Sequence, residues 1–186
     1  MVYETDGMYG GYHDIILLSQ IEGRILMIKE IAKEEIGECV ELIRISFATV
    51  AKEFHITEEN APRYGGFATT EERLLSQYEQ KRPMIAYYNE IGKIIGYYSL
   101  NKGESGECEL NNLCVLPEYR HKGIGTELVE DSFHRAKGLC FKKIRIGIIE
   151  ENTVLKEWYS KQGFIHKDTK KFDFFPFTCG YMEKGL

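Results

Sequence analysis

Hydrophobic positions along the chain recur with two different periods, which predict strands and helices in a mixed order. Short runs of β-branched and aromatic residues predict strands over 24–31, 84–88, 94–100, 107–116, 143–149, 164–170 and 177–183. Spacings of three and four residues predict helices over 32–52, 69–80, 123–138 and 152–162. Residues 53–68 are polar and carry Pro62, Gly65 and Gly66, so a loop or a broken helix is expected there.

Two local signals mark helix ends. Thr69 followed by Glu72 predicts a capping box at the start of the second helix, because such side chains satisfy backbone N–H groups that the helix leaves unpaired. Gly163 follows the fourth helix and is typical of the residue just beyond a helix end, where a left-handed backbone is needed.

The order of these elements predicts a mixed α/β (α+β) fold with one sheet of about seven, mostly antiparallel strands and helices on both faces. Segment 107–149 is a strand–helix–strand unit, which predicts one parallel strand pair joined by a crossover. Residues 27–186 are expected to form this single domain. For residues 1–26 two interpretations stay open. One is an extra strand or arm that packs on the domain. The other is a translation start at Met27, because 22–24 can be encoded by a stretch resembling a bacterial ribosome-binding site.

Composition narrows the class of protein. The 186 residues suit one domain, and the longest apolar runs, such as 15–18, are too short to cross a bilayer. Lys and Arg number 24 against 29 Asp and Glu, a net charge of -5, whereas a protein that binds nucleic acid through its bulk charge is normally basic. We therefore expect no nucleic-acid or membrane partner, and an anionic ligand must be held by a local site.

The cysteines and histidines argue against metal and disulfide chemistry. The 5 cysteines stand at irregular spacings without a CxxC pair, which favours reduced, mostly buried thiols in a cytoplasmic protein. The 5 histidines show no HExxH or similar close pairing, so no metal site is expected.

Segment 113–126 carries the clearest chemistry. A strand ends at Pro117, three basic residues follow, and Gly123 and Gly125 open a helix. A helix N-terminus presents unpaired N–H groups and the positive end of the helix dipole, and glycine lets a large anion approach the backbone. This pattern predicts a phosphate or pyrophosphate site over 120–126.

Two common phosphate-binding loops do not fit this segment. A Walker loop requires a lysine after its last glycine, where Thr126 and Glu127 stand. A Rossmann fingerprint requires a third glycine, where Leu128 stands. Both are therefore disfavoured.

The segment instead resembles the acetyl-CoA signature of the GNAT superfamily of N-acetyltransferases, R/Q-x-x-G-x-G/A after an LxVxPxxR strand end. The matching residues are Leu113, Val115, Pro117, Arg120, Gly123 and Gly125. A later family motif, N-x-x-A-x-x-L/F-Y-x-K-x-G-F, is matched at Asn152, Tyr159, Lys161, Gly163 and Phe164. Leu155 and Trp158 replace its usual Ala and Leu, which is expected to alter the fit around the pantetheine arm.

The resemblance implies a sheet that splays at the cofactor site. Backbone N–H groups of the signature loop would hold the pyrophosphate of the cosubstrate acetyl-CoA, and Thr126 would add a hydroxyl. The pantetheine arm would pair with the strand around Val115 and with Asn152, and a backbone N–H near Cys114 would polarise the thioester carbonyl. The cofactor-binding residues implied are Leu113, Cys114, Val115, Arg120, His121, Lys122, Gly123, Ile124, Gly125, Thr126 and Asn152.

The reaction implied is direct attack of an amine on the thioester, which needs a base and an acid. Glu109 stands where some family members keep a glutamate base, four residues before Leu113 and on the same strand face if no bulge intervenes. The alternative role of Glu109 is a solvated strand carboxylate. Tyr159 matches the tyrosine that protonates the leaving thiolate, and its alternative role is a packed aromatic. Cys114 is expected to be a buried thiol rather than an acyl-carrying nucleophile.

The acceptor is expected to be a primary amine of a small molecule or peptide, bound between the first two helices and later strands. Aromatic residues that would form a cage for a cation, or else pack in the core, are Phe47, Phe54, Tyr64, Tyr97, Phe175 and Tyr181. Two other functions stay open, a non-catalytic acyl-CoA-binding or sensing module and a nucleotide-phosphate enzyme that uses Gly123 and Gly125. A homodimer is compatible with the resemblance, because dimers are common in this family.

Overall fold

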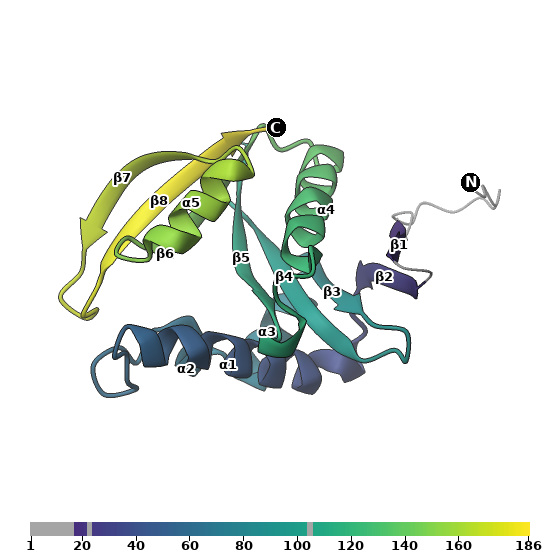
Figure 1. Cartoon of the computed structure of the whole chain (residues 1–186), viewed down its shortest axis with the longest axis horizontal. Helices are drawn as coiled ribbons and strands as arrows, with labels where there is room; N and C mark the ends of the chain where they lie inside the picture. The colour runs from purple at the N-terminus through teal and green to yellow at the C-terminus, as the bar shows by residue number, and fades with distance from the viewer. Residues whose placement is uncertain (1–16, 22–23, 104–105) are drawn as a thin grey trace.

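The computed structural model describes residues 17–21, 24–103 and 106–186, which build one sheet with helices on both faces (Figure 1). Its strands are β1 (Leu17–Ile21), β2 (Arg24–Glu30), β3 (Met84–Tyr88), β4 (Ile94–Lys102), β5 (Glu107–Val115), β6 (Lys143–Ile149), β7 (Ile165–Lys171) and β8 (Thr178–Gly185). Its helices are α1 (Ile36–Glu53), α2 (Gly65–Ala68), α3 (Glu71–Glu79), α4 (Ile124–Gly138) and α5 (Thr153–Lys161), with 3₁₀ turns at Lys33–Glu35 and Pro117–Tyr119.

The seven expected strands and four expected helices are all present, with ends shifted by a few residues. The expected broken helix is the short helix α2. The predicted capping residue of α3, Thr69, was wrong by one position. Thr70 caps the helix, and its hydroxyl oxygen accepts a hydrogen bond from the N–H of Arg73 at 3.2 Å. Thr69 is buried, and its hydroxyl donates to the Gly65 carbonyl at 2.7 Å. Gly163 has the expected left-handed φ of 88°.

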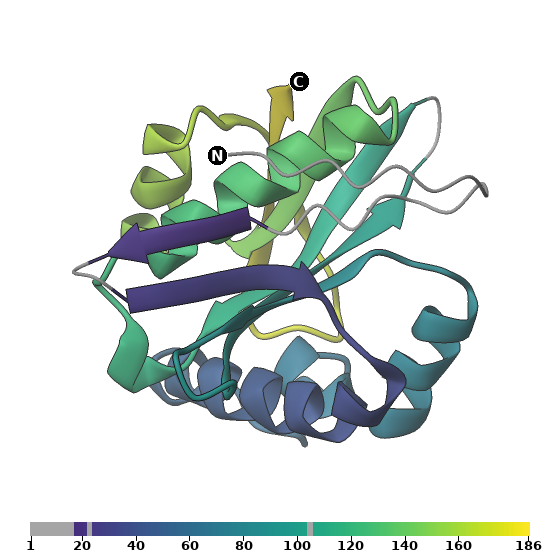
Figure 2. The same cartoon turned by 90° about the vertical axis from the view of Figure 1, so that its right-hand side faces the viewer.

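The strand order in the sheet is β1-β2-β3-β4-β5-β6-β8-β7. Neighbouring strands are antiparallel except β5 and β6, so the parallel pair expected across segment 107–149 is confirmed. Helix α4 provides the crossover and packs on β4 and β5, while α1 packs on the same two strands from the other face (Figure 2). The mixed fold with two covered faces is therefore as expected.

Strand β1 adds an eighth strand to the seven that were expected. It pairs antiparallel with β2, with Leu17 opposite Ile28 and Ile21 opposite Arg24. The expected domain boundary between residues 26 and 27 lies inside β2. The start-site hypothesis and the division into an extension and a domain stay predictions. Residues 1–16 lie outside the described part of the chain.

The sheet opens between β5 and β6 (Figure 1). The two strands pair only from Glu107 opposite Lys143 to Glu109 opposite Arg145. Beyond this point β5 runs on beside β4 alone, and β6 runs on beside β8 alone. Facing edges of two strands are thus left without strand partners among the described residues, which is the splay implied by the family resemblance.

A β-bulge bends β5 next to this opening. Tyr97 pairs with Cys114 but Ser99 pairs with Asn111, so β5 has one residue more than β4 in this interval. Asn112 accommodates it with a left-handed φ of 53°. A bulge re-aims the side chains on its two sides. The condition on which Glu109 and Leu113 were expected to share a face is therefore not met.

Two clusters of buried side chains hold the fold together. The main core lies at the centre of the sheet, where Tyr87, Tyr97 and Tyr98 are completely buried. A smaller cluster joins the end of α1 to β6 and the segment before β8, and its buried members are Ala51, Ile56, Ala61, Tyr64, Ile149 and Phe177. Among the described helices, none combines the length and the apolar character that crossing a membrane requires.

Candidate active site

The N-terminus of α4 presents unpaired backbone donors beside the opening in the sheet. Gly123 caps this helix with φ 87°, a left-handed conformation that other residues adopt only with strain. Within the described residues, the N–H groups of 121–125 have no hydrogen-bond partner, whereas the N–H of Thr126 donates to the Gly123 carbonyl at 2.9 Å. This is the arrangement of an anion site. The N–H of Thr126 is already used, so only the hydroxyl of Thr126 can contribute to such a site.

Arg120 is not the open positive charge that the sequence indicated. Its guanidinium donates to the Val115 carbonyl at 3.1 Å, to the Thr49 hydroxyl at 2.9 Å and to the Ser46 carbonyl at 2.9 Å. Its backbone N–H donates to the Pro117 carbonyl. Arg120 therefore fastens the loop to α1 and to the end of β5. The sequence could not show this, because α1 lies about seventy residues earlier.

The other basic residues of the loop remain exposed. His121 has a left-handed φ of 61°, and the ammonium of Lys122 lies 5.1 Å from the centre of the Tyr119 ring. Ile124 is buried, so it can serve an anion only through its backbone. At Gly125 an added Cβ would lie 3.4 Å from the ring of Trp158. Trp158, an unusual residue at this motif position, therefore packs over the first turn of α4.

The end of β5 borders the opening through Leu113, Cys114 and Val115. Cys114 and Val115 are buried, and Leu113 packs against the main core. Burial raises the pKa of the Cys114 thiol, which is therefore protonated at neutral pH. A protonated thiol is a poor nucleophile, in keeping with the expectation of a structural cysteine.

Asn152 precedes α5 and caps that helix. Its side-chain oxygen accepts a hydrogen bond from the N–H of Leu155 at 3.0 Å. The side-chain NH₂ has no partner among the described residues and remains available as a donor. A role of Asn152 toward a ligand is thus restricted to donation from this group.

Tyr159 lies in α5 with its ring packed between two aromatic neighbours. The ring centroids of Trp158 and Phe164 are 4.8 and 5.4 Å from that of Tyr159. Burial raises the pKa of the Tyr159 phenol, and the nearby Cys114 thiol raises it further. The packed-aromatic role and the acid role are therefore compatible, because the ring is held in place while its hydroxyl keeps its proton.

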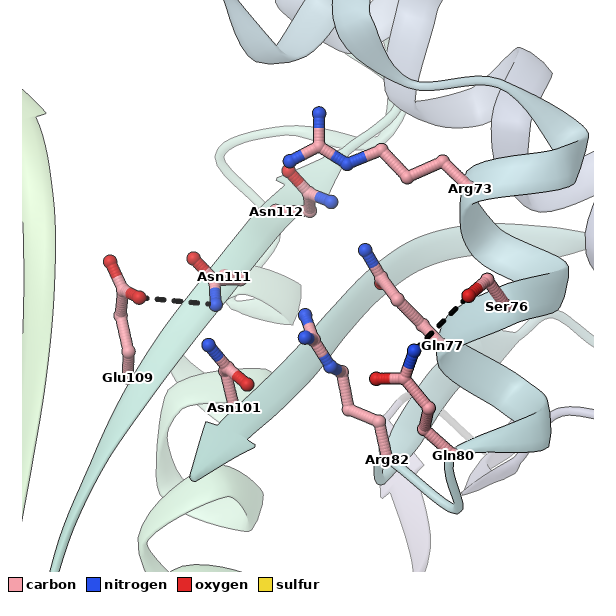
Figure 3. Close-up of a pocket in the computed structure, with 9 residues that line it drawn as sticks. All are labelled: Arg73, Ser76, Gln77, Gln80, Arg82, Asn101, Glu109, Asn111 and Asn112. Atoms are coloured by element: carbon pink, nitrogen blue, oxygen red, sulfur yellow. Dashed lines mark hydrogen bonds between the residues drawn. The ribbon is translucent and has the colours of Figure 1, made fainter. Parts of the chain in front are cut away.

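Glu109 lines a cavity of about 580 Å³ between β4, β5 and α3 (Figure 3). Its carboxylate accepts a hydrogen bond from the Asn111 side chain at 3.5 Å. The remaining lining residues are Arg73, Ser76, Gln77, Gln80, Arg82, Asn101 and Asn112. All of them are polar or charged. Glu109 therefore faces a shared cavity and is not an isolated strand carboxylate.

The aromatic residues proposed for an acceptor cage do not line this cavity. Tyr97 is completely buried in the main core. Tyr64 belongs to the smaller cluster, and Phe47, Phe54 and Phe175 pack against that cluster. The packing alternative describes these four side chains and Tyr97, and the aromatic cage stays a prediction.

Apart from Glu109, the residues that line the cavity were missed because none belongs to a motif. One signal was present in the sequence: Arg73, Gln77 and Gln80 recur at spacings of four and three, which places them on one face of a helix. Arg82 and Asn101 reach the cavity from a loop and from β4, and no local pattern indicates that they meet. Within the described ranges, no three His, Cys, Asp or Glu side chains are grouped so as to hold a metal ion.

The model of the acetyltransferase (GNAT) family matches residues 51–164. An uncharacterized N-acetyltransferase of Mycobacterium tuberculosis is 28% identical over 81 residues, which are 44% of this chain and 52% of that protein. The chain thus spans about half the length of this curated relative.

Two solved structures share the fold over a larger part of this chain. The PaiA N-acetyltransferase from Thermoplasma acidophilum, in complex with coenzyme A, is 23% identical with a TM-score of 0.74, covering 87% of this chain and 99% of that one. A GNAT family acetyltransferase from Elizabethkingia anophelis with acetyl-CoA bound is 25% identical with a TM-score of 0.56, covering 62% of this chain and 83% of that one.

Proposed function

This chain belongs to the GNAT family of acetyltransferases, and on this premise we propose that it moves an acetyl group from acetyl-CoA to a primary amine of a small molecule or peptide by direct attack. The observation that carries the proposal is the opening between β5 and β6 beside the N-terminus of α4. These two features together offer an anion site and an unpaired strand edge, which is what a long cofactor with a diphosphate and an amide-containing arm requires.

The residues present fit acetyl-CoA. The unpaired N–H groups of 121–125 would meet an anion without competing backbone bonds, and Gly123 would leave room for it. The edge of β5 around Val115 would pair with the pantetheine amides through backbone groups other than the Val115 carbonyl, which Arg120 already uses, and the Asn152 side chain would provide a donor. Acetyl-CoA supplies an activated acyl group as its thioester.

Tyr159 and Glu109 are the proposed acid and base. Tyr159 holds its proton because burial raises its pKa, so it can donate to a leaving thiolate. Glu109 lies in a polar cavity that opens to solvent, where it can take a proton from an acceptor ammonium directly or through water. The protonated state of Cys114 favours direct attack over an acyl-cysteine route.

The test combines binding with turnover. Calorimetry with coenzyme A is expected to show one site per chain, and release of free CoA from acetyl-CoA is expected with at least one member of a broad amine panel. If CoA binds while release stays at background across the panel, catalysis is refuted and the acyl-CoA-binding module replaces it. If ATP or GTP binds better than CoA, the nucleotide alternative replaces both.

A further inference from the structure

We propose that the acceptor is an amine that also carries a carboxylate, as a free amino acid does, and that Arg73 and Arg82 bind this carboxylate in the cavity beside Glu109. The inference rests on the acetyltransferase function proposed above and specifies its substrate class.

Two arginines reach this cavity from different elements (Figure 3). Arg73 projects from α3, where its guanidinium donates to the Ala68 carbonyl at 3.3 Å. Arg82 stands between α3 and β3, and its guanidinium makes no hydrogen bond or ion pair with the described residues. Each arginine therefore brings donors that no protein group among these residues uses. Guanidinium groups bind carboxylates through two parallel hydrogen bonds when the geometry allows.

The charges in the cavity are unbalanced. Burial lowers the pKa of Arg82, and the positive charge of Arg73 also lowers it, while Glu109 acts in the opposite direction. The two guanidinium groups thus repel each other, and Glu109 is the one acidic side chain among the residues that line the cavity. Two positive charges against one negative charge leave one net positive charge. A carboxylate of the ligand placed between the two guanidinium groups would offset their mutual repulsion.

The polar lining disfavours an apolar amine. The lining amides come from Gln77, Gln80, Asn101, Asn111 and Asn112. Gln77 is only 8% exposed and its side chain lies between the two arginines (Figure 3). An apolar ligand would remove water from these groups without replacing its hydrogen bonds, which costs free energy for every group left unpaired. A ligand with its own polar and charged atoms avoids this cost.

The position of Glu109 relative to the two arginines predicts the orientation of the ligand in the cavity. Glu109 lies on the β5 side of the cavity, across from Arg73 and Arg82 on the α3 side (Figure 3). An ammonium group placed near Glu109 and a carboxylate placed near the arginines would each meet the opposite charge. Amines with several positive charges and no anion would meet two repulsive guanidinium groups.

The experiment compares acceptors that differ only in the carboxylate. L-phenylalanine is paired with 2-phenylethylamine, L-tyrosine with tyramine, L-histidine with histamine and L-lysine with cadaverine. For the pairs that react, kcat/KM is expected to be at least about tenfold higher for the amino acid, the size of effect that one charged hydrogen-bonded contact produces. Equal or better turnover of the decarboxylated amines would overturn the proposal.

Two variants test whether Arg73 and Arg82 contact the carboxylate of the ligand. Arg82→Gln and Arg73→Gln are expected to raise KM for the amino acid about 10- to 100-fold, without weakening CoA binding and without penalising the decarboxylated partner. Lys137→Gln is the matched control, because it removes one positive charge from the exposed end of α4 on the opposite face of the sheet. A preference for the amino acid that survives in both arginine variants would refute the assignment.

A binding measurement separates this inference from the proposed activity. Calorimetry with the same amino acids and amines is run on the protein saturated with free CoA, where no turnover occurs. Binding of the amino acid that is lost in Arg82→Gln supports the carboxylate site even if no acceptor reacts. Binding of the amine alone, or of neither compound, overturns it whatever the enzyme assay shows.

Discussion

The guanidinium of Arg120 donates to the carbonyl oxygen of Ser46 at 2.9 Å, which ties the loop before α4 to helix α1. A second donor of Arg120 reaches the Thr49 hydroxyl and a third reaches the Val115 carbonyl. The arginine of the signature thus holds together three segments around the end of β5. We therefore expect Arg120 to act on ligand binding through the position of the loop.

Arg120→Lys should therefore weaken both the fold and the cofactor site. A lysine ammonium cannot reproduce the planar fork that donates to three acceptors. We expect the free energy of unfolding to fall by about 1–3 kcal/mol, and CoA affinity to fall with it. Urea unfolding and calorimetry provide the measurements. Arg145→Lys, at an exposed ion pair with Glu107, is the control and should change stability by less than about 0.5 kcal/mol.

Gly123→Glu should abolish CoA binding. The added side chain strains a backbone with φ 87° and puts a negative charge where the unpaired N–H groups point. Gly123→Asn, which tolerates a left-handed backbone, separates strain from repulsion and should bind CoA more tightly than Gly123→Glu. Gly138→Glu at the other end of α4 is the control, since a Cβ there meets nothing within 4 Å. Unchanged affinity in Gly123→Glu would contradict the anion site.

Tyr159→Phe should lower kcat about 100-fold while CoA affinity stays unchanged, as expected for loss of a general acid. Because burial raises the pKa of Tyr159, its phenol stays protonated across roughly pH 6–10, and the deficit should be constant over that range. Tyr78→Phe, another ring packed against the main core, is the control. A normal kcat in Tyr159→Phe would leave Tyr159 only its packing role.

Glu109→Gln should lower kcat/KM by about 100-fold or more and remove the rise of the rate with pH that a base produces as it loses its proton. Glu107→Gln is the matched control two residues earlier on β5, where the carboxylate pairs with Lys143 and Arg145. A wild-type pH profile in Glu109→Gln would exclude Glu109 as the base.

Acid should destabilise the sheet around β6 and β8. The hydrogen bond from Lys167 lowers the pKa of Glu183, and Lys143 lowers it further. A lowered pKa in the folded state gives stability that is present above the unfolded value, about 4.3, and lost as the pH falls through the folded value. The urea midpoint should therefore fall below about pH 4, and the difference between wild type and Glu183→Gln should shrink there. The exposed Glu58→Gln is the control.

Local chemistry in the chain was enough to predict most of the architecture. The periods of 2 and 3.6 residues placed every expected strand and helix. The loop with Gly123 predicted an anion site, because glycine conformation and helix N-termini depend on neighbours in sequence. The motif residues at 113–125 and 152–164 indicated the family for the same reason, since each motif lies within one short segment.

Contacts between distant segments were decided by folding alone. The bulge at Asn112 depends on how β5 pairs with β4. It interrupts the regular alternation of side chains from which Glu109 and Leu113 were expected to share a face of the strand. Packing turned Arg120 inward to α1, and it brought Arg73 and Arg82 to one cavity from separate elements. Such long-range contacts depend on the path of the whole chain, because the energy of a contact is set by three-dimensional distance and burial. Spacing along the sequence determines neither of these quantities.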